Sequence, residues 1–175
     1  MTAALRSFAL AARNNAWSND TFYGAIAKMD VGTFTALRPG FFASLSRTLN
    51  HIYEVDLYLL DALEEGGMGR SVFGHVDVPQ PAALHALQQR ADARLIAFCD
   101  RLDDVTLTQL RTMERKDTTA QETVIDLLLQ LFQHQIHHRG QAHVQLSHAG
   151  IDPPQLDEFY LACMRPPSAQ KFYGD

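Results

Sequence analysis

The sequence has little cysteine and no cysteine motif. Cys99 and Cys163 are its only cysteines among 175 residues, and neither belongs to a CxxC pattern or a Cys/His cluster. A small domain held together by disulfides is therefore not expected, and this usage is typical of a reducing compartment. The sequence thus predicts a cytoplasmic protein.

Basic clusters and long apolar runs are also missing. Lysine and arginine number 15 against 20 acidic residues, which gives a formal net charge of -5, whereas nucleic-acid-binding domains usually carry a basic surface. No apolar run approaches the ~18–20 residues of a membrane span. Residues 1–17 are interrupted by Arg6 and Arg13, so they lack the apolar region of a signal peptide. We expect neither nucleic acid nor a membrane as a partner.

Apolar residues recur at helical spacing in four long segments. These segments run from about Thr2 to Met29, from about Phe42 to Glu65, from after Pro81 to about Phe98, and from about Thr119 to Gly150. Thr119 and Glu122 have the spacing of a capping box at the start of the fourth segment, and Gly66 follows the end of the second. Four amphipathic helices predict an all-α four-helix bundle, with residues 1–175 forming one domain.

Two shorter features complete the predicted fold. Residues 105–116 alternate weakly between polar and apolar side chains, which predicts a short β-hairpin between the third and fourth helices. The chain after Gly150 is predicted to be a loop with a short helix around residues 156–164. No internal repeat or low-complexity segment is present.

The fourth predicted helix contains the run His134-Gln135-Ile136-His137-His138-Arg139-Gly140-Gln141. Histidines 134 and 138 are four residues apart, so on a helix both imidazoles lie on one face. Neutral imidazole is a common metal ligand, and the pair could form half of a metal site. The alternative is that both are hydrogen-bonded core or surface histidines, since this spacing arises readily in a histidine-rich helix. Histidine 137 points about 100° away and is expected to face solvent or to lie behind the ligands.

The same spacing occurs in the HExxH motif of zinc peptidases, but here Gln135 stands in place of the glutamate. Glutamine cannot accept a proton, which disfavours peptidase chemistry of that type. A third ligand would come from a facing helix, and His51 in the second predicted helix is the best candidate, although it lies off the centre of the apolar stripe. His75 and His85 are expected on the surface.

Three neutral imidazoles with one open coordination position are typical of a catalytic zinc site rather than a structural one. Nickel and iron also accept imidazole, so the residues alone do not select the metal.

The chain resembles the DinB-like (DinB/YfiT-like) superfamily over about residues 10–160. The matching motifs are Leu49-Asn50-His51-Ile52 followed by Asp56, and the histidine run from 134 to 141. Weaker similarity is found in Asn15-Ala16-Trp17-Ser18-Asn19 and in Gly150-Ile151-Asp152-Pro153-Pro154 with Asp157.

This resemblance implies an up-down-down-up bundle that is usually a homodimer. It also implies a divalent metal held by His51, His134 and His138, with zinc or nickel ahead of iron or manganese. Characterised relatives include transferases and isomerases that use mycothiol, bacillithiol or glutathione.

Four neighbouring residues receive provisional roles. Arg139 could bind an anionic group or lie on the surface, and the surface position is favoured. Gln141 and Gln145 share the stripe of His134 and His138 and could hydrogen-bond a water or ligand near the metal. Asp56 is five residues from His51, so a link to a histidine would run between helices.

The leading functional hypothesis is a metal-dependent enzyme of the thiol S-transferase or hydrolase type, with a low-molecular-weight thiol and a small-molecule substrate as partners. A bound metal would lower the pKa of a thiol or water. The competing hypothesis is a non-catalytic dimeric bundle in which the metal is structural or incidental, because no general base is recognisable. No catalytic residue is assigned from the sequence.

Overall fold

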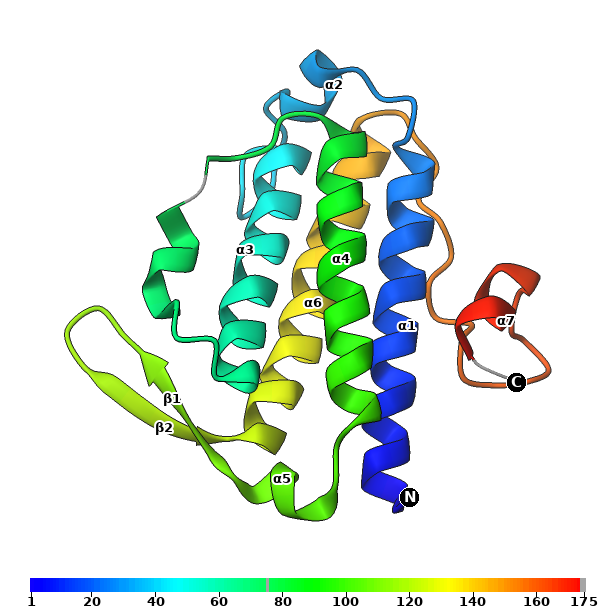
Figure 1. Cartoon of the computed structure of the whole chain (residues 1–175). Helices are drawn as coiled ribbons and strands as arrows, with labels where there is room; N and C mark the ends of the chain where they lie inside the picture. The colour runs from blue at the N-terminus through cyan, green and yellow to red at the C-terminus, as the bar shows by residue number, and fades with distance from the viewer. Residues whose placement is uncertain (75, 174–175) are drawn as a thin grey trace.

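Four long helices form the body of the protein (Figure 1). The computed structural model describes residues 1–74 and 76–173. The long helices are α1 (Ala3–Ala25), α3 (Leu45–Glu64), α4 (Pro81–Asp100) and α6 (Val124–His148). Helices α1 and α6 run in one direction and α3 and α4 in the other (Figure 1), which confirms the up-down-down-up four-helix bundle.

Because α3 and α4 run in the same direction, the chain between them must return along the whole bundle. Helix α3 ends where Glu65 adopts a left-handed backbone, with φ of 57°. The Asp61 carboxylate accepts hydrogen bonds from the backbone N–H groups of Met68 and Gly69, which fixes the start of the return. The 3-10 helix η1 (Gly69–Gly74) follows on the way to α4.

A hairpin between the third and fourth long helices is confirmed, but it lies at residues 110–123 rather than within the predicted residues 105–116. After the short helix α5 (Asp104–Thr108), strand β1 (Leu110–Glu114) pairs antiparallel with β2 (Thr119–Thr123). The predicted capping box at Thr119 and Glu122 is wrong, because both residues lie in β2. Helix α6 begins later, and the Thr123 hydroxyl accepts the backbone N–H of Asp126. Threonine is favoured both in strands and at helix N-caps. The spacing of Thr119 and Glu122 alone therefore predicted the wrong start for the fourth long helix.

Two other predictions at the ends of helices need correction. The first helix ends at Ala25 rather than near Met29, and a short helix, α2 (Val31–Thr35), follows. The helix expected around residues 156–164 is absent from that described segment, which forms turns and bends. The final helix is α7 (Pro167–Tyr173) instead. Phe159 is fully buried and packs on Trp17, with ring centroids 5.7 Å apart. This contact holds residues 156–164 in an irregular path along α1.

The bundle core changes from apolar to polar and back to apolar along its length. One apolar cluster includes Leu5, Leu60 and Leu128, and the other includes Phe22, Leu49 and Leu146. Between them lies a layer of buried polar side chains, here called the middle layer. Its members are Asn15 and Asn19 from α1, Asp56 from α3, Gln88 and Asp92 from α4, and Gln135 and Arg139 from α6.

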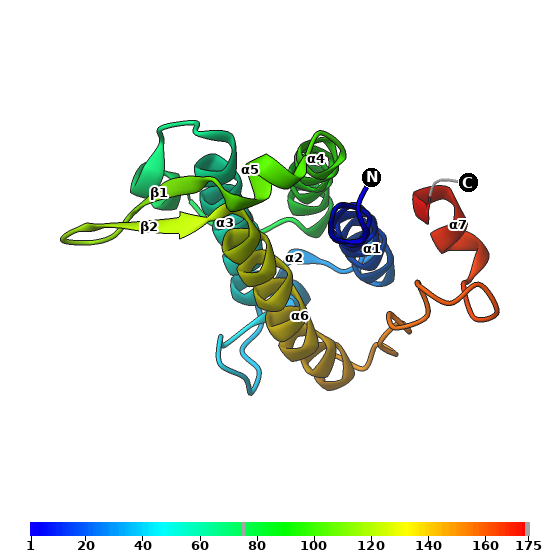
Figure 2. The same ribbon diagram turned by 90° about the horizontal axis from the view of Figure 1, so that it is seen from below.

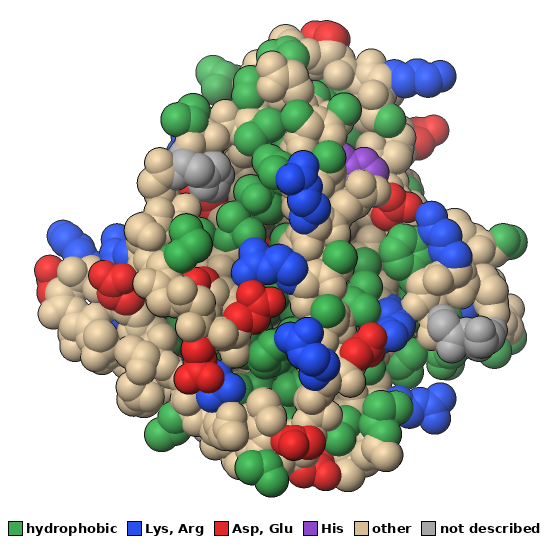
Figure 3. Space-filling model, viewed as in Figure 1, with side chains coloured by type: hydrophobic (Ala, Val, Ile, Leu, Met, Phe, Trp, Pro, Cys, Tyr) green, Lys and Arg blue, Asp and Glu red, His purple; other side chains and the backbone are tan. Residues whose placement is uncertain are grey.

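The charged residues of the surface are of mixed sign. On the face in Figure 3, basic and acidic side chains are interspersed among apolar ones. Arg94 and Glu64, 2.7 Å apart, form one such pair between α4 and α3. Within the described residues, none of the helices combines the length and the apolar character needed to cross a bilayer.

Candidate metal centre

Three histidines from α3 and α6 converge at the side of the bundle. His51 comes from α3, and His134 and His138 lie one turn apart on α6. Each offers a ring nitrogen, and these nitrogens all lie within 4.8 Å of one another. The Nε2 atoms of His51 and His134 are 3.0 Å apart. The structure therefore brings together the three residues that the sequence singled out as candidate ligands.

The helical repeat explains why these side chains meet. On α6, Leu131 and Gln135 are fully buried, and His134 and His138 lie beside this buried stripe on the flank that faces α3. On α3, His51 stands next to Ile52, which is buried in the core. Each imidazole is thus held at the edge of the core, close enough to its neighbours to share a ligand.

The surroundings keep the imidazoles neutral. Burial, reinforced by the neighbouring histidines, lowers the pKa of His51 to about 4 and that of His134 to about 3. Burial also lowers the pKa of His138. All three rings therefore have lone pairs available at neutral pH, which is the form that binds metal.

The donor set fits a divalent cation. Tetrahedral zinc with Zn–N bonds of about 2.0–2.1 Å places its nitrogen ligands roughly 3.3 Å apart. The spacing in the cluster, from the 3.0 Å contact to the 4.8 Å limit, brackets that value.

Gln141 orients one of the three rings. Its Oε1 atom accepts a hydrogen bond from His138 Nδ1 at 2.9 Å, which leaves His138 Nε2 with its lone pair. Its Nε2 atom lies 3.0 Å from Nε2 of His137. His137 is exposed, as predicted, and its ring is 4.8 Å from that of His138.

Two phenylalanines that sequence reasoning missed border the cluster. The Phe42 ring lies 4.5 Å from the His51 ring and 5.6 Å from the His138 ring. Phe41 lies 6.2 Å from His138 and is 77% exposed. The second helix is predicted to begin at about Phe42, but α3 begins at Leu45, so both phenylalanines lie in the irregular chain before it. A helical repeat therefore could not place them beside the histidines.

Gln145 anchors the phenylalanine segment to α6. Its Nε2 donates to the Phe42 carbonyl at 2.8 Å, and its Oε1 accepts from the Thr48 hydroxyl at 2.8 Å. A side chain at Gly40 would come within 2.9 Å of the Gln145 amide nitrogen, so glycine allows this close approach. Gln145 thus holds Phe42 beside the histidines.

The expected surface position of Arg139 is wrong. Its side chain is buried and enters the middle layer, where Nη1 donates to Asn15, Asn19 and Gln135. Asn15 and Asn19 in turn donate to Asp92. Two amides thus bridge a buried cation and a buried carboxylate. Burial lowers the pKa of Arg139 to about 10, so it remains charged at neutral pH.

Asp56 also belongs to the middle layer, and within the described residues it makes no direct hydrogen bond to a histidine. Its Oδ2 atom accepts from the side-chain amides of Gln88 and Gln135, while Oδ1 is buried without a partner among the described residues. Burial and nearby Asp92 raise the pKa of Asp56 well above its usual range. The neutral acid is therefore favoured, and its proton provides a donor at an otherwise unpaired carboxyl group.

The family is decided by comparison with known proteins. A model of the DinB family matches residues 1–169. The chain belongs to the DinB family. No curated protein matches this DinB chain in sequence.

Solved structures of DinB-like proteins share its fold. One from Bacillus cereus ATCC 10987 has 16% identity and a TM-score of 0.62, covering 79% of this chain and 90% of the other. Another, from Bacillus subtilis, has 18% identity and a TM-score of 0.55, covering 84% and 92%.

His85 does not belong to the histidine cluster of this DinB chain. His85 is half-buried rather than fully at the surface, and its ring stacks on Tyr23 with centroids 4.9 Å apart. The expected surface position of His75 lies outside the described residues. Among those residues, the group of possible ligands comprises only His51, His134 and His138.

Proposed function

We propose that His51, His134 and His138 bind a divalent metal ion and that the protein is a metal-dependent enzyme of the thiol S-transferase or hydrolase type. Zinc or nickel is the preferred ion, with iron or manganese next. The observation that carries the proposal is the convergence of three neutral imidazoles without a fourth His, Cys, Asp or Glu among the described residues. Such a set leaves a coordination position for a ligand.

The protein groups around this position have distinct tasks. When bound, the metal would lower the pKa of a thiol or water and so provide a nucleophile near neutral pH. Gln141 keeps His138 in the tautomer that presents Nε2. Phe42 covers one side of the cluster and limits access of water, while the exposed ring of Phe41 offers an apolar surface to a small-molecule substrate.

A second candidate function is a non-catalytic homodimer with a structural metal. It is favoured by the apolar residues Leu129, Ile136 and Val144, which are more than half exposed on α6. The open coordination position favours the enzyme, since structural zinc sites usually have four protein ligands. For location, the exposed free thiol of Cys163 supports a reducing compartment and hence the cytoplasm.

Elemental analysis of the purified protein tests the metal site. We expect about one metal ion per chain in the wild type and its loss in His51→Ala and His138→Ala, because two imidazoles seldom retain a divalent ion. His148→Ala is the matched control, since His148 is exposed near the end of the same helix. Full occupancy in both cluster variants would refute the three-histidine site.

Thiols test the catalytic part of the proposal. Thermal denaturation and turnover of electrophilic substrates should be measured with a panel of low-molecular-weight thiols, using the metal-loaded wild type and His138→Ala. We expect thiol-dependent stabilisation or turnover in the wild type alone. Full metal occupancy with no response to any thiol and no hydrolysis would favour the structural alternative.

A further inference from the structure

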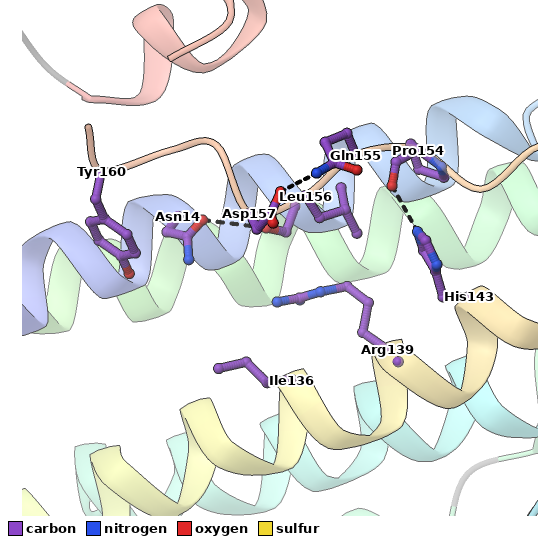
Figure 4. A pocket seen from close by; sticks show the side chains of 11 residues that line it. Asn14, Ile136, Arg139, His143, Pro154, Gln155, Leu156, Asp157 and Tyr160 are labelled. Carbon is purple, nitrogen blue, oxygen red and sulfur yellow. Dashed lines mark hydrogen bonds between the residues drawn. The ribbon is translucent and has the colours of Figure 1, made fainter. Parts of the chain in front are cut away.

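A cavity of about 500 Å³ borders helix α6 (Figure 4). Its walls come from α1, α6 and the segment 154–160. Gly140 lines it two positions after His138, and residues two apart on a helix point in nearly opposite directions. The cavity is therefore separate from the candidate metal centre, although both use α6.

The outer wall of this cavity is a fixed part of the fold. After α6 the chain passes along the opening between α6 and α1 before it reaches α7 (Figure 2). Near one end of this segment, Pro154 accepts a hydrogen bond from His143 Nε2 at 2.7 Å. Near the other end, the fully buried Phe159 packs on Trp17. The segment thus forms a wall attached to both helices.

Arg139 is the buried cation of the cavity. Its side chain extends from α6 into the space between the walls (Figure 4) and is only 7% exposed. Within the described residues, every hydrogen bond that its guanidinium donates comes from Nη1. Nε and Nη2 therefore donate no hydrogen bond to another described residue, and Arg139 is one of the residues that line the cavity.

The free edge of this guanidinium defines the chemistry of a ligand. Nε–H and Nη2–H lie side by side and match the two oxygens of a carboxylate. Most of the remaining wall is apolar, with Ile136, Leu156 and Tyr160 among its residues. The exposed carboxylate of Asp157 at the same cavity disfavours ligands that carry several negative charges.

The volume supports a small ligand. Pockets for small molecules commonly measure about 300–1,000 Å³ and combine apolar walls with a few polar groups. Gly140 leaves room in this wall, because a Cβ atom added there would meet nothing within 4 Å.

We infer that the cavity between α1, α6 and segment 154–160 is a second ligand site, which binds a small monocarboxylate with a compact apolar body. The carboxylate pairs with the Nε–Nη2 edge of Arg139, and the apolar body lies against Ile136 and Tyr160. This site is independent of metal binding by the three histidines.

Titration with hexanoate and phenylacetate, followed by backbone-amide NMR, tests the inference on the full chain. We expect saturable shifts at Ser18, Gly140 and Leu156, and binding of the corresponding amides weaker by about tenfold or more, because they lose the charge-assisted pair. Gly140→Leu should abolish binding by filling the cavity. Gly24→Leu is its control, since Gly24 is an exposed helical glycine outside the cavity with equally open space around it.

Three outcomes would overturn the inference. Equal affinity for acids and amides would show that Arg139 does not select a carboxylate. Unchanged binding by Gly140→Leu would place the probes elsewhere. Absence of saturable binding, together with a wild-type dimer that Gly140→Leu dissociates in sedimentation experiments, would show that this face of α6 is an interface between two copies of the chain.

Discussion

Helix α6 carries two polar clusters whose side chains are paired in different ways. In the middle layer, amides of Asn15 and Asn19 link the Arg139 cation to the Asp92 carboxylate through hydrogen bonds between helices. In the histidine cluster, neutral rings point nitrogens at one another without any counter-ion among the described residues. The first arrangement pairs a buried cation with a buried carboxylate inside the fold, whereas the second gathers neutral ring nitrogens that could hold a cation.

Burial alone does not distinguish these two clusters. His138 and Arg139 are neighbours and similarly buried, at 8% and 7% exposure. Arg139 holds α6 to α1 through Asn15 and Asn19, whereas His138 faces α3 within the histidine cluster. Mutations in the two clusters should therefore affect different measurements, with stability sensitive to the middle layer and metal affinity sensitive to the histidine cluster.

The largest stability effect is expected from Arg139→Met. Removing the cation leaves the buried Asp92 carboxylate without its bridged partner, which should lower the free energy of unfolding by about 3–5 kcal/mol. Urea denaturation measures this loss. Arg94→Met removes a surface arginine that pairs with Glu64 and should cost about 0–1 kcal/mol. Similar losses in both variants would contradict the role assigned to the middle layer.

The pH dependence of stability should reveal Asp92. Burial raises its pKa to about 6 in the native protein, against about 3.9 in an unfolded chain. The native state therefore binds the proton more tightly than the unfolded chain does. The stabilising contribution of Asp92 to the free energy of unfolding is largest below pH ~4 and is lost as the pH rises through ~6. Relative to Asp92→Asn, wild-type stability should fall by roughly 1–3 kcal/mol across that window.

Chemical denaturation of both proteins at several pH values provides the measurement. Asp152→Asn controls for the loss of one negative charge, because Asp152 is exposed. A constant difference between wild type and Asp92→Asn across the window would show that Asp92 does not titrate there.

Gln141→Ala should affect the histidine cluster while sparing the fold. Loss of the hydrogen bond to His138 Nδ1 is expected to weaken metal binding by about 10–100-fold. Competition with a chelator measures the affinity, and the melting temperature of the metal-free protein should hardly change. Gln133→Ala, an exposed glutamine on the same helix, is the control. Equal metal affinities of Gln141→Ala and Gln133→Ala would show that Gln141 does not support metal binding.

The smallest effect is expected from Asp56→Asn. If Asp56 is a neutral acid, asparagine has the same shape and also combines an acceptor with a donor, so stability at pH 7 should stay within about 1 kcal/mol of wild type. Asp56→Ala removes the acceptor of the Gln88 and Gln135 amides and should cost more. Thermal unfolding distinguishes the two, and a large loss in Asp56→Asn would indicate a charged carboxylate.

Local patterns predicted the long helices and the convergence of His134 and His138. A helical repeat of apolar residues determines which face is buried, and spacing of four places two imidazoles together. His51 could be proposed because bundle sites draw ligands from facing helices. Its distance from His134 depended on how α3 packs, and spacing along one helix does not contain that information.

The burial of Arg139 could not be predicted in the same way. Its partners Asn15, Asn19 and Asp92 lie on other helices, and their relation to Arg139 appears only after the bundle assembles. The position of Phe42 likewise depends on its backbone contact with Gln145 from α6. Long-range pairing of polar groups thus accounts for much of what the sequence left open.

The parallel course of α3 and α4 has a consequence for how the chain folds. Contacts that hold the middle of the bundle join residues 77 apart for Asn15 and Asp92, 79 apart for Asp56 and Gln135, and 83 apart for His51 and His134. Helical proteins with mostly local contacts fold fastest, because long loops cost entropy before their contacts form. We therefore expect slower folding than in an up-and-down bundle of this size. A fragment that ends after α3 would lack the partners of both α1 and α3, so synthesis must reach α6 before the core can close.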